Sequence, residues 1–229
     1  HTADVIGVRL DASVEAIAKD LHFLVATPPV QGLVRAHVGG VKVRDAEQEQ
    51  AFIDPQTNID DREWRDQLAN TLSVFLENRP SYVQVSVIGL TKQGGREVVR
   101  VEKRDGTPRR QPPAAWQARR NDPFFRKAIA LPEGAFHLSD IELTPTSDSR
   151  APMPLMRAIT PVYATNGRVY GAIAIHVDAR PMFEAVASLI DAGHCAGARV
   201  QRYRHADVAH LAERLANSAG RSCNRLIVS

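Results

Sequence analysis

Residues 156–177, MRAITPVYATNGRVYGAIAIHV, predict two strands joined by a tight turn. The stretches 156–163 and 169–177 are rich in residue types that favour β-strands. Asn166-Gly167 lies between them and is the strongest short sequence signal for a β-hairpin, because both residues accept the positive φ angles of such a turn. We therefore expect an antiparallel sheet in this part of the chain.

A second hairpin is predicted over residues 82–102. Valines alternate with other residues before a turn at Gly94-Gly95, and the returning strand begins at Val98. Regular alternation in that strand places Val98 on the same face as Arg100 and opposite to Val99. The two hairpins together predict a sheet that contains at least four strands.

Helices are predicted before, between and after these hairpins, because apolar residues recur there at helical spacing. The predicted helices span residues 11–26, 30–38, 61–78, 123–131, 182–190 and 207–219. Asp122 and Pro123 fit the N-cap and first position of the short helix that follows the second hairpin. Residues 107–120 are rich in Pro and Arg and are predicted to form a long loop.

The composition indicates a globular protein. The chain has 229 residues, of which 44% are hydrophobic and 24% are charged, which allows a sizeable core. Its longest nearly uninterrupted apolar run, residues 169–177, is far shorter than the roughly 20 residues that a membrane-spanning helix needs. The opening His1-Thr2-Ala3 has no signal-peptide pattern. The net charge of +3 is spread along the chain, so we expect no nucleic-acid partner.

Sequence motifs for catalysis are missing. The chain contains no GxSxG, Walker-type phosphate loop, GxGxxG or HExxH pattern. Its eight histidines are scattered, and the two cysteines have no neighbouring ligands at zinc-site spacing. We therefore expect neither an enzyme nor a bound cofactor or metal.

Several segments between residues 83 and 178 share their order and spacing with a known group of domains. They are VQVSVIG (83–89), GREVVRVE (95–102), NDPFFRKA (121–128), FHLSD (136–140), RAITPVY (157–163), NGRVYG (166–171) and IHVD (175–178). These segments resemble the Cache family, the PAS-like extracytoplasmic sensor domains of bacterial histidine kinases, diguanylate cyclases and chemoreceptors. Upstream, TPPVQGLVRA (27–36) and WRDQL (64–68) resemble the helical part of such sensors.

The resemblance implies an α+β fold with long N-terminal helices packed on a PAS-like five-stranded antiparallel sheet. The fifth strand is the short stretch 135–139. We expect an N-terminal helical region over residues 1–80, the Cache sensor domain over 81–180, and a C-terminal helical appendage or incomplete second unit over 181–229. A double-Cache sensor has a second PAS-like unit after the first, but only about fifty residues follow Asp178 here.

The resemblance also places a ligand between the sheet and the loop and helix that cross it, residues 111–131. The expected ligand-binding residues are Trp116, Arg120, Phe124, Phe125, Arg126, Arg157 and Asp178. Aromatic rings would wall the site and arginines, Arg119 among the candidates, would meet an anion. The alternatives are core packing for the aromatics, a surface position for Arg126 and a capping role for Asp178. Amino-acid-binding members carry an arginine where this chain has Asp122, so the resemblance implies no amino-acid binding through that position.

The expected function is that of a periplasmic ligand-sensing domain of a transmembrane signalling receptor, of histidine kinase or diguanylate cyclase type. Its partner would be a small polar or anionic molecule, and the parent protein would be anchored in the inner membrane. The alternative is a periplasmic solute-binding or adhesion module without signalling output.

Two further expectations concern the cysteines and the oligomer. An even count allows a disulfide between Cys195 and Cys223, which an oxidising periplasm would favour, whereas two free thiols remain the alternative.

The helices over 11–26 and 61–78 carry more apolar surface than one sheet face covers, so we expect a homodimer through exposed residues among Val14, Ile17, Leu21 and Leu24.

Overall fold

The structure is a computed structural model, and it describes residues 2–44, 50–119, 121–144 and 152–189. Arg120, the predicted helix over 207–219 and the pair Cys195 and Cys223 lie outside the described residues. Within the described part of the chain, no helix is both long and apolar enough to cross a membrane.

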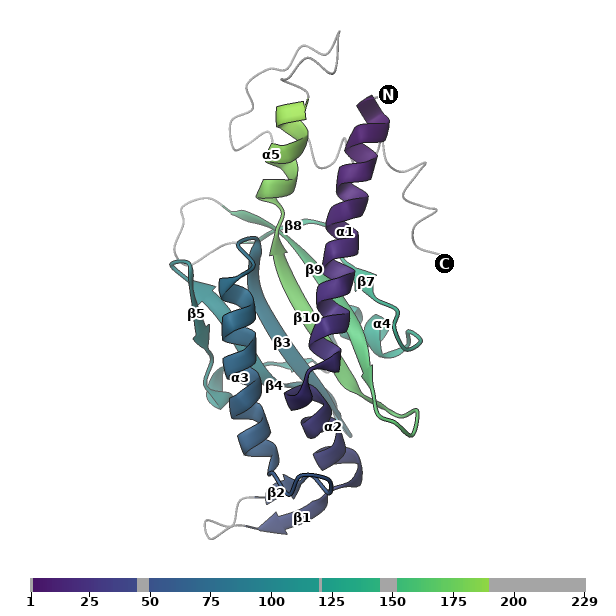
Figure 1. The fold of residues 1–229 in the computed structure, drawn as a ribbon, viewed down its shortest axis with the longest axis vertical. Helices are drawn as coiled ribbons and strands as arrows, with labels where there is room; N and C mark the ends of the chain where they lie inside the picture. The colour runs from purple at the N-terminus through teal and green to yellow at the C-terminus, as the bar shows by residue number, and fades with distance from the viewer. Residues whose placement is uncertain (1, 45–49, 120, 145–151, 190–229) are drawn as a thin grey trace.

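An antiparallel sheet forms the centre of the fold (Figure 1). Its four long strands are β3 (Tyr82–Thr91), β4 (Gly94–Arg104), β9 (Met153–Tyr163) and β10 (Val169–Asp178). Its short strands are β5 (Thr107–Arg110), β6 (Ala118–Arg119), β7 (His137–Leu138) and β8 (Glu142–Thr144). The order is β5-β4-β3-β10-β9-β7, with β6 paired to β4 and β8 paired to β9. Both predicted hairpins, β3–β4 and β9–β10, are present.

The sheet has eight strands rather than the five expected. All five predicted strands exist, and β5, β6 and β8 add to them. β5 lies in the predicted loop because Asp105 and Gly106 both take positive φ angles, 50° and 76°, which is the geometry of a two-residue hairpin turn. The chain therefore folds back along β4 before it crosses the sheet.

Three helices cover one face of the sheet: α1 (Thr2–Ala26), α2 (Pro28–Gly39) and α3 (Asp61–Glu77) (Figure 1). α1 begins at Thr2 rather than at Asp11. It ends where predicted, because Thr27 precedes Pro28 and takes an extended conformation with ψ 142°. Between α2 and α3 the chain forms a small hairpin that was not predicted, β1 (Val41–Arg44) with β2 (Gln50–Ile53).

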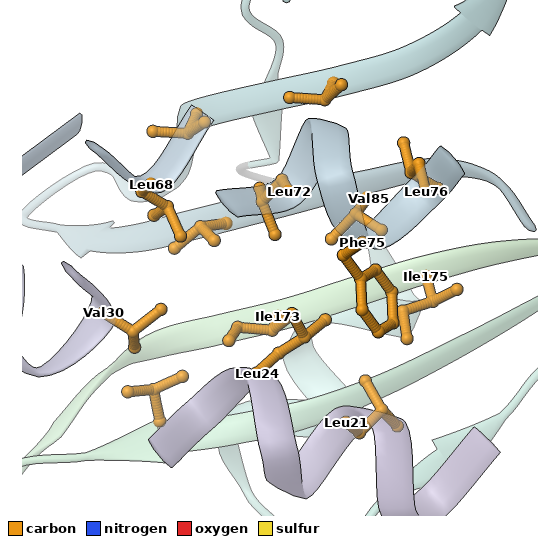
Figure 2. Close-up of a cluster of buried hydrophobic side chains, with 14 of the residues drawn as sticks. Leu21, Leu24, Val30, Leu68, Leu72, Phe75, Leu76, Val85, Ile173 and Ile175 are labelled. Carbon is orange, nitrogen blue, oxygen red and sulfur yellow. The ribbon is translucent and has the colours of Figure 1, made fainter. Parts of the chain in front are cut away.

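The main hydrophobic core lies between these helices and the sheet (Figure 2). Leu24 of α1, Leu72 of α3 and Ile173 of β10 are fully buried there and point toward one another. The apolar residues that recur at helical spacing in α3 are all buried in this core: Trp64, Leu68, Leu72, Phe75 and Leu76. Helices and sheet therefore stabilise each other through one shared core, and the α+β architecture expected from the sequence is confirmed.

The opposite face of the sheet carries α4 (Pro123–Ile129), which packs on a smaller apolar cluster. The carboxylate of Asp122 caps α4 by accepting the backbone N–H of Phe124, as predicted. After β10 the chain enters α5 (Arg180–Leu189), which contacts α1. Figure 1 shows α5 and the first half of α1 side by side, beyond one end of the sheet.

Candidate functional site

Polar side chains form a row across the four long strands, on the face that α4 covers. The strand register aligns Arg157 of β9, His176 of β10, Gln84 of β3 and Glu102 of β4. Residues two positions along each strand share this face, because side chains alternate in a strand. Ser86 therefore lies on it as well, aligned with Arg100.

A β-bulge adds Glu97 to this face. Val87 pairs with Val99, whereas the next residue, Ile88, pairs with Glu97, so Val98 is an extra residue in β4. Val98 consequently packs against the main core, and the expectation that it shares a face with Arg100 is wrong. We call Gln84, Ser86, Glu97, Arg100, Glu102, Arg157 and His176 the polar floor.

A buried carboxylate organises one half of the polar floor. Glu97 is 0% exposed and accepts hydrogen bonds from Arg119 Nη2 at 2.8 Å, Arg100 Nη1 at 3.3 Å and the Gln117 backbone N at 2.9 Å. Arg119 also reaches the Asp122 carboxylate at 3.4 Å. These contacts hold two arginine side chains against the sheet and tie the crossing loop to β4.

Three buried polar atoms in this region have no hydrogen-bond partner among the described residues. They are Ser86 Oγ, Arg100 Nε and Arg119 Nε. Arg100 Nε lies 3.6 Å from a Glu102 oxygen, which is an ion pair but too long for a good hydrogen bond. Buried polar atoms without partners are rare in folded proteins, and three of the five found among the described residues lie on this side of the sheet.

Aromatic residues of α4 lie over the other half of the polar floor. The guanidinium carbon of Arg157 is 4.6 Å from the centre of the Phe124 ring, a cation–π contact. The Phe124 ring centre is 5.4 Å from that of His137. Phe125 is fully buried and packs on Gly95 so closely that a Cβ at Gly95 would lie 2.5 Å from its ring. α4 is therefore held directly against the sheet.

His176 lies at the centre of the polar floor and is neutral at pH 7. Burial, followed by the positive charges of Arg119, Arg157 and Arg100, lowers its pKa to about 4. A neutral imidazole can both donate and accept a hydrogen bond. The positive charge of this face therefore comes from arginine side chains alone, and Glu97 and Glu102 balance part of it.

The structure brings some of the predicted ligand-binding residues together and separates others. Phe124, Phe125 and Arg157 meet at the polar floor. Trp116 is half-buried and donates its indole N–H to the Gln111 carbonyl at 3.1 Å, while Arg126 is exposed.

Asp178 is engaged with its own neighbour. Its carboxylate accepts the backbone N–H of Arg180 and pairs with the Arg180 guanidinium at 2.6–3.0 Å, so it caps the start of α5. This matches the capping alternative.

Sequence reasoning did not single out Ser86, Glu97, Arg100 or His176 as site residues. Alternation along the predicted strands could have placed Ser86 and Arg100 on the face opposite to the core valines. The position of Glu97 on this face could not be predicted without knowledge of the bulge at Val98. Among the described residues, no group of three His, Cys, Asp or Glu side chains is placed to hold a metal ion.

Long helices on one face of an antiparallel sheet, with a short helix and a crossing loop on the other, define a Cache-like α+β fold. The chain is similar to the domain of a sensory box/GGDEF family protein from Vibrio parahaemolyticus, with 15% identity and a TM-score of 0.59, covering 81% of this chain and 61% of that chain. It is also similar to the extracellular domain of a protein named as a histidine kinase, vpHK1S-Z8, with 14% identity and a TM-score of 0.61, covering 81% and 59%. The chain thus spans about 60% of the length of these two structures.

No family model matches the chain. A stretch of 43 residues is 58% identical to 8-amino-7-oxononanoate synthase of Alkalilimnicola ehrlichii (strain ATCC BAA-1101 / DSM 17681 / MLHE-1). It covers 19% of this chain and 10% of that enzyme, which is too little to show a shared fold or activity. The resemblance to Cache-type sensors that the sequence motifs indicated is confirmed at the level of the fold.

Proposed function

We propose that this chain is the periplasmic ligand-sensing domain of a membrane-anchored signalling receptor. Its ligand would be a small polar or anionic molecule that binds at the polar floor beside α4. The observation that carries this proposal is the group of buried, unpartnered atoms Ser86 Oγ, Arg100 Nε and Arg119 Nε. Each can donate a hydrogen bond, and an oxygen-rich ligand would accept them.

Arg157 would hold the charge of the ligand. Its neighbouring carboxylate, Glu142, is 63% exposed and 3.6 Å away, so this ion pair is weak and easily exchanged. The Phe124 ring already orients the guanidinium and would form an apolar wall. A guanidinium held in this way can bind a carboxylate through two parallel hydrogen bonds.

The path from the polar floor to α5 is short. His176 and Asp178 lie on the same face of β10, and only Ala179 separates Asp178 from α5. A ligand that displaces β10 would therefore displace α5, which lies beside α1 at one end of the molecule (Figure 1). This arrangement supports a sensor over a module that binds solutes without signalling, because a sensor must change the position of an output element.

A thermal-shift screen with small carboxylates, amines and amino acids tests this proposal. A ligand at a hundred times its dissociation constant should stabilise the protein by about 2.7 kcal/mol. For a hit, Arg157→Gln should weaken binding by about 10- to 100-fold, since a charge-assisted hydrogen bond contributes about 1.5–3 kcal/mol. Arg96→Gln is the matched control, because Arg96 is exposed on the same sheet and should leave binding unchanged. A hit that binds Arg157→Gln and Ser86→Ala as tightly as the unmodified chain would contradict the proposed site.

We further propose that the receptor is a homodimer formed through α1 and α3. Ile17, Leu21 and Leu24 were expected among the contact residues, but they are buried in the core and cannot form this contact. Exposed apolar surface lies instead at Phe23 and Val74, which are 57% and 59% exposed and line a groove of about 580 Å³. Both residues lie on the long helices, where a two-fold axis would bring two α1 helices together.

Sedimentation measurements test the dimer. The double substitution Phe23→Glu with Val74→Glu should lower the mass at high protein concentration, because it places charges in the proposed contact. Leu143→Glu is the control, since Leu143 is 51% exposed on β8, outside the groove. An unmodified chain that sediments as a monomer at high concentration would argue against this contact.

A further inference from the structure

A separate cavity of about 200 Å³ lies between the end of α2 and the tips of the two hairpins. His37 and Val38 of α2 line it on one side, and Gly89, Val98 and Tyr170 of the sheet line it on the other. We call it the α2 cavity. None of these residues belongs to the polar floor, so the α2 cavity is distinct from the site proposed above.

Two irregular points of the sheet meet at the α2 cavity. One is the bulge at Val98. The other is at Tyr170, where the pairing of β10 with β9 shifts between Val169 and Gly171. Both side chains consequently pack toward the helices, in the main core. Bulges are often found beside functional sites, where they redirect a side chain that regular alternation would place elsewhere.

The Tyr170 hydroxyl is the unusual group in this cavity. Tyr170 is only 6% exposed, and its hydroxyl has no hydrogen-bond partner among the described residues. Burial raises the pKa of Tyr170 above its ordinary value. The hydroxyl therefore stays protonated and can donate a hydrogen bond. An unpartnered buried hydroxyl costs about 1–3 kcal/mol, which a bound acceptor would recover.

Gly89 keeps the space beside this hydroxyl open. A Cβ at Gly89 would lie 3.7 Å from the Tyr170 oxygen and 3.2 Å from Val98 Cγ1. Any larger residue would therefore fill part of the cavity.

The rest of the lining is mostly apolar. Val38, Leu90, Val98 and Val169 supply aliphatic walls, Thr91 is a neutral polar residue, and the exposed Arg168 adds a guanidinium. His37 is neutral because burial lowers its pKa, and its Nε2 lies 3.1 Å from Asp61 Oδ2, to which it donates. The described lining contains no acidic side chain. These surroundings favour a negatively charged oxygen on an apolar body.

We propose that the α2 cavity binds a small carboxylate with an apolar body, of about the size of benzoate. The carboxylate accepts a hydrogen bond from Tyr170 and pairs with Arg168, and the hydrocarbon part lies against the valines and Leu90. The volume is below the range of roughly 300–1,000 Å³ typical of drug-sized ligands, which restricts the occupant to a small molecule. Such a ligand would hold α2 against both hairpins.

Benzoate and its uncharged analogue benzamide are the probes for this site. Protein-observed NMR at millimolar benzoate should shift the amide signals of Gly89, Val98 and Val169, and benzamide should bind more weakly. Tyr170→Phe should weaken benzoate binding by about 10-fold or more, the effect of losing one hydrogen bond to a charged group. It should leave the melting temperature unchanged or higher, because the hydroxyl it removes has no partner. Gly89→Ala should also weaken binding by narrowing the cavity.

Arg157→Gln separates this site from the polar floor. Benzoate binding that persists in Arg157→Gln and falls in Tyr170→Phe supports the α2 cavity. Binding that is lost in Arg157→Gln and kept in Tyr170→Phe would overturn the proposal and assign benzoate to the polar floor. No change of these amide signals at millimolar benzoate would also overturn it, and the cavity would then hold water only.

Discussion

Replacement of Glu97 by alanine is expected to lower the free energy of unfolding by about 3–5 kcal/mol, the usual cost of removing one partner from a buried ion pair. Glu97 is fully buried and receives hydrogen bonds from Arg100, Arg119 and the Gln117 backbone. Arg100 is itself buried, so its charge would remain in the protein without this partner. Urea denaturation followed by circular dichroism measures the change.

Glu142→Ala is the matched control for this substitution. It also removes a carboxylate that pairs with an arginine of the same sheet, but Glu142 is 63% exposed and 3.6 Å from Arg157. Its loss should change the free energy of unfolding by less than about 1 kcal/mol. Equal, small effects of both substitutions would mean that water reaches Arg100 and Arg119 and replaces the lost carboxylate.

The second large effect is expected at the contact between α2 and α3. A Cβ at Gly32 would lie 2.2 Å from Cε2 of the Trp64 ring, a separation that atoms cannot adopt. Trp64 is buried, so its ring has little room to move away. Gly32→Ala should therefore force the two helices apart and lower the free energy of unfolding by about 3 kcal/mol or more, at the upper end of the cost of overpacking a core.

The same substitution seven residues later in α2 provides the comparison. A Cβ at Gly39 would meet nothing within 4 Å. Gly39→Ala should raise the free energy of unfolding by about 0.5–1 kcal/mol, because alanine restricts the unfolded chain more than glycine does. Chemical denaturation of both variants measures the difference. A Gly32→Ala variant as stable as the unmodified chain would show that α2 can shift on α3 at little cost.

The elements with strong local signals could be predicted from the sequence. Asn166-Gly167 placed the β9–β10 turn, and Asp122-Pro123 placed the start of α4. The apolar stripe of α3 identified residues that are buried in the structure. In each case the residue types that fix the backbone are adjacent in the chain or repeat with the period of the element, so no tertiary information was needed.

The polar floor could be predicted only in part, because it depends on strand register. Phe124, Phe125 and Arg157 were expected near the ligand and lie together. A single extra residue at Val98 brings Glu97 onto the face of Arg100, and nothing in the local sequence marks that bulge. The strands β5 and β6 were missed because they lie in the Pro- and Arg-rich stretch predicted as a loop, and β8 was missed because three residues show too little of an alternating pattern.

The direct connection between β10 and α5 has a thermodynamic consequence. The carboxylate of Asp178 pairs with the guanidinium of Arg180, and only one residue lies between them. No flexible loop therefore separates the strand from the helix, and the two cannot move independently. If ligand binding at the polar floor favours one position of α5, then linkage requires that a force fixing α5 in that position tightens ligand binding by the same factor. In the proposed receptor, the affinity for the ligand would then differ from that of the free domain, and it would depend on any output element that fixes the position of α5.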